Sequence, residues 1–92
     1  MAFLDVTLRA TQEILSLSPS NFNKVQDTLN MLQTYPRAAQ TAGIRGVPEV
    51  RRAVAGKYLI FYFYEENTDV IYVLTVRHGA RKPPTRKDLF EE

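Results

Sequence analysis

The sequence lacks several residue types on which common kinds of functional site depend. Its 92 residues include no cysteine, no tryptophan and a single histidine, His78. The absence of cysteine excludes a disulfide framework, a thiolate metal site and a cysteine nucleophile, and it is typical of a reducing compartment. One histidine excludes a multi-histidine zinc site within one chain. We therefore expect neither a metal nor another cofactor.

Long apolar runs are also missing. No stretch approaches the roughly 18 residues of a membrane span, and Met1–Val6 does not read as the start of a signal peptide. Hydrophobic residues make up 45% of the chain and charged residues 24%, with only 4 glycines and 5 prolines, which excludes a low-complexity chain. The length suits one core. We expect a single domain over residues 1–92, soluble, cytoplasmic and without membrane contact.

The net charge of +2 is unevenly distributed. Met1–Gly43 carries three basic and three acidic residues, whereas Arg45–Lys87 carries nine basic and four acidic residues, a net charge of +5. Asp88–Glu92 then contributes −3. This asymmetry predicts one face suited to a polyanion or an acidic partner, with an ordinary solvated surface as the alternative.

Two helices are expected in the first part of the chain. Phe3–Leu8 alternates apolar and polar residues, which favours a short strand, although the first turn of a helix is the alternative. Apolar residues at helical spacing predict a helix over Arg9–Leu17 that Pro19 breaks, and Ser18 and Ser20 are suitable N-caps for a second helix. The second helix has an amphipathic stripe, which we interpret as core: Phe22, Val25, Leu29 and Leu32. Tyr35-Pro36 ends it.

The second part of the chain predicts an antiparallel meander. Arg37–Glu49 contains glycine and proline without periodicity and is expected to be a loop. Strands are expected over Val50–Ala55, Tyr58–Glu65 and Val70–Arg77, the first two joined by a tight turn at Gly56-Lys57. Both faces of Tyr58–Glu65 are apolar, which is typical of a strand in the middle of a sheet. The predicted fold is α+β, ordered β-α-α-β-β-β, with a helical hairpin packed on a small antiparallel sheet.

The C-terminal segment and the aromatic strand each leave two interpretations. Thr85–Glu92 either forms one helical turn or frays. The aromatic run Tyr58–Tyr64 invites comparison with an RNA-recognition sheet, but the order of elements differs and the expected glycine is missing, so core packing is favoured. Glycine-rich phosphate loops, the G-x-S-x-G elbow and H-E-x-x-H are all missing from the sequence.

A cationic cluster is the remaining candidate for a site. The candidate binding residues for a target or a protein partner are basic side chains of the second part of the chain: Arg45, Arg51, Arg52, Arg77, Arg81 and Lys82. Arg51 and Arg52 are adjacent on a strand, so only one of them can face a given site. His78 is the only side chain that ordinarily titrates near neutral pH, which makes it either a general acid or base or a structural hydrogen-bonding residue.

These motifs together resemble one family. Arg51–Tyr62, followed after a hairpin by Ile71–Arg81, resembles the RelE/ParE toxins of bacterial type II toxin–antitoxin pairs. That family combines an arginine-bearing strand, a glycine turn, a strand reading roughly Tyr-x-Ile-Phe-Tyr, and a strand ending in Val-x-His-x-x-Arg. The β-α-α-β-β-β order and the proline stop from Leu32 to Pro36 agree with this resemblance.

The resemblance implies growth inhibition by one of two mechanisms. In the RelE branch, which cleaves messenger RNA on the ribosome, His78 would transfer a proton while Arg52, Arg77 and Arg81 stabilise charge. That branch often carries a tyrosine after the last strand, and this chain has none beyond Tyr72. The ParE branch is not enzymatic and poisons DNA gyrase. Its typical His-Gly-x-Arg ending is matched by residues 78–81, which favours this branch. An inactive toxin scaffold that serves as a binding partner is a third hypothesis.

The resemblance also implies a protein partner. Antitoxins of this family are usually acidic and order as they wrap the toxin, held by apolar anchors and charge pairs. We expect the basic region from Arg45 to Lys87 to receive such an antitoxin. The other implied partners are DNA gyrase or the ribosome with its messenger RNA, and operator DNA only through the antitoxin.

Overall fold

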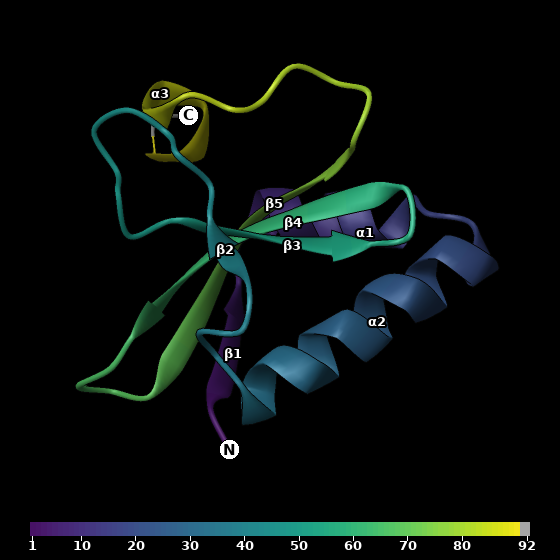
Figure 1. The fold of residues 1–92 in the computed structure, drawn as a ribbon. Coiled ribbons are helices and arrows are strands. Elements are labelled where there is room, and N and C mark those ends of the chain that lie inside the picture. Colours follow the sequence, from purple (N-terminus) through teal and green to yellow (C-terminus); the bar gives the residue numbers. More distant parts are fainter. Residues whose placement is uncertain (91–92) are drawn as a thin grey trace.

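A five-stranded sheet carries the fold, with two helices on one face and a short helix on the other (Figure 1). The computed structural model describes residues 1–90. Its elements are β1 (Phe3–Val6), α1 (Leu8–Leu15), α2 (Pro19–Thr34), β2 (Gln40–Thr41), β3 (Arg51–Ala55), β4 (Tyr58–Glu65), β5 (Val70–His78) and α3 (Arg86–Phe90). Across residues 1–90, no helix has both the length and the apolar character needed to cross a membrane.

The predicted α+β order is confirmed, and two short elements are added to it. β2 lies within the segment predicted as a loop, where two residues pair with the start of β3. Such a strand is too short to leave a periodic signal in the sequence. α3 agrees with the helical-turn alternative for Thr85–Glu92, whose last two residues lie outside the described residues.

Side-chain caps set where the two long helices begin. Thr7 accepts a hydrogen bond from the Ala10 backbone N–H, so α1 starts one residue earlier than predicted and ends at Leu15. Ser18 caps α2, and Pro19 occupies its first turn. Proline needs no backbone hydrogen bond at that position, so the residue predicted to break the first helix instead opens the second.

The sheet is mixed, whereas an antiparallel sheet was predicted. Its strand order is β1-β5-β4-β3-β2, and the meander of β3, β4 and β5 is antiparallel as expected. β1 joins the other side of β5 in parallel, with Phe3 opposite Val70 and Val6 opposite Val73. Alternating residues predict that a segment is a strand, but they do not specify its neighbour or its direction.

The central strand is covered on both faces, as its apolar sequence predicted. Ile60 and Tyr62 face the helices and belong to the same cluster as Val25 of α2. Phe61 faces the other way and packs with Leu89 of α3. The two clusters place α1 and α2 on one face of the sheet and leave the other face to α3 and the loop before β3.

A bulge interrupts the pairing of β4 with β5. Phe61 lies opposite Thr75 whereas Tyr62 lies opposite Val73, so Leu74 is an extra residue in β5. β1 also ends level with Val73, which leaves the following part of β5 without a strand on that side. α1 covers this part and supplies one hydrogen-bond acceptor to it, Glu13 Oε1.

Candidate functional site

Cationic side chains line a small pocket where β5 leaves the sheet. The pocket has a volume of about 150 Å³. We call it the cationic pocket. It is lined by Arg52, Leu59, Phe61, Arg77, His78, Gly79, Arg81, Lys82 and Pro83. None of these residues is acidic, so the pocket is suited to an anion.

Strand register decides which of the adjacent arginines faces the pocket. Arg52 lies opposite Phe61 and Arg77 lies opposite Leu59, on the face that carries α3. Arg51 points to the helix-bearing face instead. The structure thus answers a question that the sequence left open, because Arg52 lines the pocket and Arg51 does not.

Two of the predicted basic residues lie away from the pocket. The Arg51 guanidinium donates hydrogen bonds to the backbone carbonyls of Ala39, at 2.7 Å, and Arg37, at 3.4 Å. Arg51 therefore holds the connection between α2 and β2. Arg45 is exposed in the loop before β3 and is not among the lining residues.

None of the pocket cations forms a salt bridge within residues 1–90, although, besides a backbone hydrogen bond, the charge of Arg77 helps to lower the pKa of the Asp88 carboxyl. Arg77 donates through Nη1 to the Lys82 carbonyl at 3.2 Å, and its buried Nε has no hydrogen-bond partner among residues 1–90. Within the described chain, the ion pair that forms joins Arg37 to Glu66 at 2.8 Å, beside the turn between β4 and β5. The positive charge of the pocket is thus available to a ligand.

A tight turn follows β5 and carries Arg81 to the pocket. The Ala80 backbone N–H donates to His78 Nδ1, and the Arg81 backbone N–H donates to the His78 carbonyl, both at 3.0 Å. Gly79 donates to the Lys57 carbonyl at 2.8 Å, and a Cβ at position 79 would lie 3.3 Å from that oxygen. Glycine therefore permits the close approach of this turn to the one between β3 and β4.

The imidazole of His78 packs against Tyr58. The two ring centroids are 5.4 Å apart with an interplanar angle of 77°, an edge-to-face arrangement. Tyr58 lies opposite His78 in the sheet and packs against the helix-side cluster, whereas Arg52 and Arg77 belong to the other face. The ring is thus held at the strand end beside Tyr58, and His78 also lines the pocket that contains these two arginines.

The groups whose pKa values the fold shifts lie outside the pocket. Burial raises the pKa of the Tyr62 hydroxyl, and a hydrogen bond to Asp69 raises that of Tyr64. The pKa of Asp88 is lowered, chiefly because its carboxylate accepts a hydrogen bond from the Thr85 backbone N–H. None of these groups lines the pocket.

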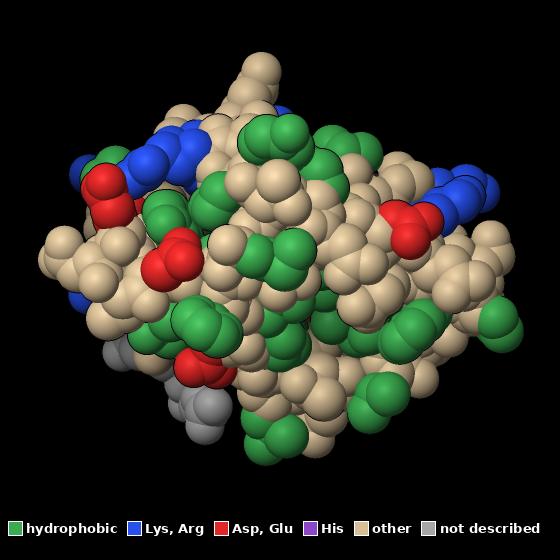
Figure 2. All heavy atoms as spheres, turned by 90° about the horizontal axis from the view of Figure 1, so that it is seen from below, with side chains coloured by type: hydrophobic (Ala, Val, Ile, Leu, Met, Phe, Trp, Pro, Cys, Tyr) green, Lys and Arg blue, Asp and Glu red, His purple; other side chains and the backbone are tan. Residues whose placement is uncertain are grey.

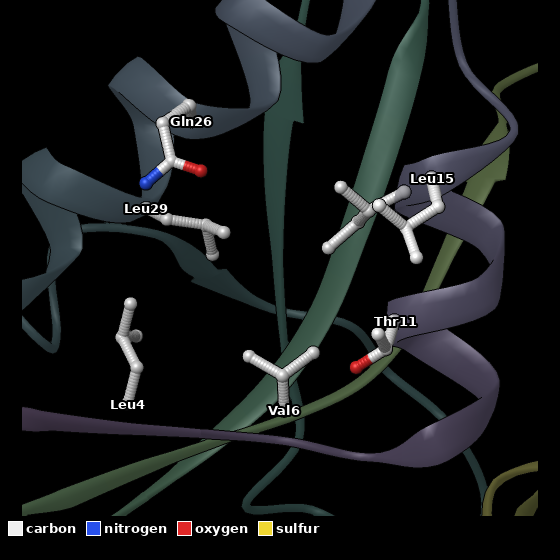
Figure 3. A pocket seen from close by; sticks show the side chains of 7 residues that line it. Leu4, Val6, Thr11, Leu15, Gln26 and Leu29 are labelled. Atoms are coloured by element: carbon white, nitrogen blue, oxygen red, sulfur yellow. The ribbon is translucent and has the colours of Figure 1, made fainter.

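A second hollow, which we call the apolar groove, lies between β1, α1 and α2. It has a volume of about 230 Å³ and is lined by Leu4, Val6, Thr11, Ile14, Leu15, Gln26 and Leu29. Figure 3 shows Leu4 and Val6 reaching into the space between the two helices. Figure 2 shows one face of the molecule, on which apolar side chains spread over the middle while lysine and arginine lie toward the ends. Sequence analysis missed the groove because its three elements contribute isolated residues.

Comparisons with known proteins agree with this architecture. The fold is similar to the isolated RelE toxin of E. coli, with a TM-score of 0.75 and 23% identity over 89% of this chain and 88% of that one. It is also similar to a chain of the RelBE2 toxin–antitoxin complex of Mycobacterium tuberculosis, with a TM-score of 0.74 and 20% identity over 84% of this chain and 96% of that one. A chain of the archaeal RelE–RelB complex of Pyrococcus horikoshii is similar with a TM-score of 0.67 and 17% identity, over 88% of this chain and 98% of that one. The fold is thus that of RelE-type toxins.

The sequence comparison places the chain within a family. The profile of the ParE toxin of the type II toxin–antitoxin system parDE matches residues 7–83. The chain belongs to this family, which confirms the resemblance to RelE/ParE toxins. No protein of curated function matches the sequence.

Proposed function

We propose that this type II toxin arrests growth by binding DNA gyrase, and not by cleaving RNA. The family match assigns the chain to the toxins of type II toxin–antitoxin pairs. The choice of mechanism rests on one observation: the cationic pocket offers anion binding without a carboxylate or tyrosine in its lining.

Cleavage of RNA by its own 2′-hydroxyl needs a proton acceptor and a proton donor beside the phosphate. Aspartate, glutamate and tyrosine are all missing from the lining of the pocket. His78 and Lys82 are the remaining candidates; of these, His78 accepts the Ala80 N–H at Nδ1 and packs its ring on Tyr58. The arginines can therefore hold an anion, while the lining provides no carboxylate or tyrosine for proton transfer during strand cleavage.

The sequence ending of β5 supports the same choice. His78-Gly79-Ala80-Arg81 matches the His-Gly-x-Arg ending typical of the ParE branch, and the family profile that matches is that of ParE. The turn that these residues form is stabilised by three backbone donors, at Gly79, Ala80 and Arg81. The motif thus has a structural role that needs no catalytic step.

Ribosome-dependent RNA cleavage is the second candidate function. The observation in its favour is that Arg52, Arg77 and Arg81 converge on one pocket whose lining also includes His78. Such a set stabilises negative charge on a phosphate. The similarity to RelE structures concerns the fold and does not favour either mechanism.

The two mechanisms are distinguished by what fails first in the cell. We expect induction of the chain to produce double-strand DNA breaks and the DNA-damage response before translation declines. With purified gyrase, it should increase the amount of cleaved plasmid. Arg81→Gln should lower this effect, and Arg45→Gln is the matched control outside the pocket. Cleaved messenger RNA and an immediate stop of translation, without DNA breaks, would overturn the proposal in favour of RNA cleavage.

We further propose that a cognate acidic antitoxin uses both surfaces described above. Solved neighbours of this fold include complexes of RelE toxins with RelB antitoxins. Folding of an antitoxin segment onto a toxin requires apolar anchors and charge pairs to offset its ordering entropy. The apolar groove matches the first kind of contact and the cationic pocket matches the second.

A further inference from the structure

We propose that His78 is a positioning residue: its imidazole accepts through Nδ1 and closes the turn that holds Arg81 in the cationic pocket, and the pocket takes an oxyanion. The oxyanion is a carboxylate or a phosphate, two ligands that share the chemistry an arginine cluster recognises. The inference rests on the proposed function in treating this pocket as the binding surface. It assigns no proton-transfer role to the histidine.

The hydrogen bond at the centre of this inference joins a side chain to the backbone two residues later. His78 Nδ1 accepts from the Ala80 N–H at 3.0 Å. Asparagine and aspartate make the same i to i+2 bond in Asx turns, where the side chain replaces a backbone acceptor. The edge-to-face contact with Tyr58 limits rotation of the imidazole and keeps Nδ1 beneath the turn.

Two further bonds hold the same turn. The Arg81 N–H donates to the His78 carbonyl at 3.0 Å, and the Gly79 N–H donates to the Lys57 carbonyl at 2.8 Å. The Arg77 side chain then reaches the Lys82 carbonyl at 3.2 Å. The segment from residue 78 to residue 82 is thereby tied to its own strand at both ends.

This ordering matters because the Arg81 side chain is exposed. Holding a binding side chain in place before the ligand arrives lowers the entropic cost of association. His78 thus strengthens anion binding through Arg81 without contacting the anion. Loss of the Nδ1 bond should weaken anion binding about two- to ten-fold, the range expected for one hydrogen bond.

The first test uses the unmodified protein. A nitrogen that accepts a hydrogen bond carries no proton, so Nε2 must hold the proton of the neutral ring. Long-range ¹H–¹⁵N spectra of the imidazole at a pH where it is neutral should show the Nε2–H tautomer. The Nδ1–H tautomer as the dominant form would overturn the proposal.

The second test compares two substitutions at one position. His78→Asn keeps an acceptor for the Ala80 N–H, whereas His78→Leu keeps an apolar contact with Tyr58 and removes the acceptor. Titration with inorganic phosphate, followed by the amide signals of the turn, should give affinity within about two-fold of wild type for His78→Asn. His78→Leu should bind about two- to ten-fold more weakly.

Two control variants test whether phosphate binds in the cationic pocket. Arg81→Gln should weaken phosphate binding at least as much as His78→Leu, and Arg45→Gln should leave it unchanged. Wild-type affinity in a folded His78→Leu variant, or equal losses in His78→Asn and His78→Leu, would overturn the proposal. If His78→Leu does not fold, the tautomer of the wild-type imidazole still tests the proposal. None of these measurements depends on gyrase or RNA, so failure here is distinct from failure of the proposed function.

Discussion

Glu13 Oε1 accepts a 2.7 Å hydrogen bond from Thr75 Oγ1, across 62 residues of sequence. The same oxygen accepts the Val76 backbone N–H at 3.0 Å. Thr75 is fully buried, and this part of β5 lies beyond the end of β1. A single carboxylate of α1 therefore satisfies two donors that the bulge and the short neighbouring strand leave without partners.

Glu13→Ala is expected to destabilise the fold. The substitution leaves the Thr75 hydroxyl and the Val76 N–H unsatisfied, which costs about 1–3 kcal/mol for a buried donor. Urea unfolding of the purified chain measures this loss. Gln12→Ala, at an exposed neighbouring position of α1, is the control and should change stability by about 0.5 kcal/mol or less. Equal stability of the two variants would show that the carboxylate is not needed at the bulge.

Acidification is expected to loosen α3. Asp88 Oδ2 accepts the Thr85 N–H at 2.9 Å, and the Asp88 N–H donates to Thr85 Oγ1 at 3.3 Å, which forms a reciprocal cap. The pKa of Asp88 is lowered in the fold, so its contribution is complete above the unfolded pKa of about 4 and is lost as pH falls through the folded pKa.

Hydrogen exchange at the Leu89 amide, which bonds to the Thr85 carbonyl, measures this effect. Protection should be constant from about pH 7 to pH 5, after correction for intrinsic exchange, and should fall below about pH 4. Asp88→Asn should remove most of the pH dependence. A fall in protection that is the same in both proteins would assign it to another group.

Antitoxin binding is expected to depend on the charge of the cationic pocket. Arg81→Glu or Arg52→Glu should weaken the complex at least about ten-fold, because each change replaces an attraction by a repulsion. Arg45→Glu makes the same change of charge outside the pocket and should have a smaller effect. Calorimetry with the antitoxin encoded beside this chain gives the affinities.

The salt dependence of the same complex provides an independent measurement. Raising the salt concentration from about 0.1 to 0.5 M should weaken the wild-type complex, because exposed charges are screened over shorter distances. The complex of Arg81→Glu should be less sensitive to salt. An affinity that does not change over this range would contradict an electrostatic contribution from the pocket.

The apolar groove is expected to contribute to the same complex independently of charge. Leu15 lines the groove and is 73% exposed, so its side chain is available to a partner. Leu15→Ala should weaken antitoxin binding about ten-fold or more, since burial of a leucine side chain is worth about 1.5–3 kcal/mol. Met31→Ala alters an exposed apolar residue of α2 outside the groove lining and should have little effect. Equal effects of the two substitutions would argue against the groove.

Local sequence patterns predicted those parts of the fold whose signal is carried by neighbouring residues. Val25, Leu29 and Leu32 of the α2 stripe are buried and Phe22 is partly buried. The continuous apolar run of β4 is the central strand. The glycine turn at Gly56 has φ of 61°, a conformation that favours glycine. These features follow from the periodicity of one segment and the backbone freedom of one residue, so they could be predicted without knowledge of any partner.

Pairing between segments distant in sequence determined the other features of the fold and of the candidate site. The parallel entry of β1, the bulge at Leu74 and the side of the sheet that Arg52 faces depend on register between segments distant in sequence. The sequence identified the basic residues and the histidine of the candidate site. The tertiary structure separated Arg51 from Arg52 and turned the His78 ring toward Tyr58, because a shift of one residue along a strand moves a side chain to the opposite face.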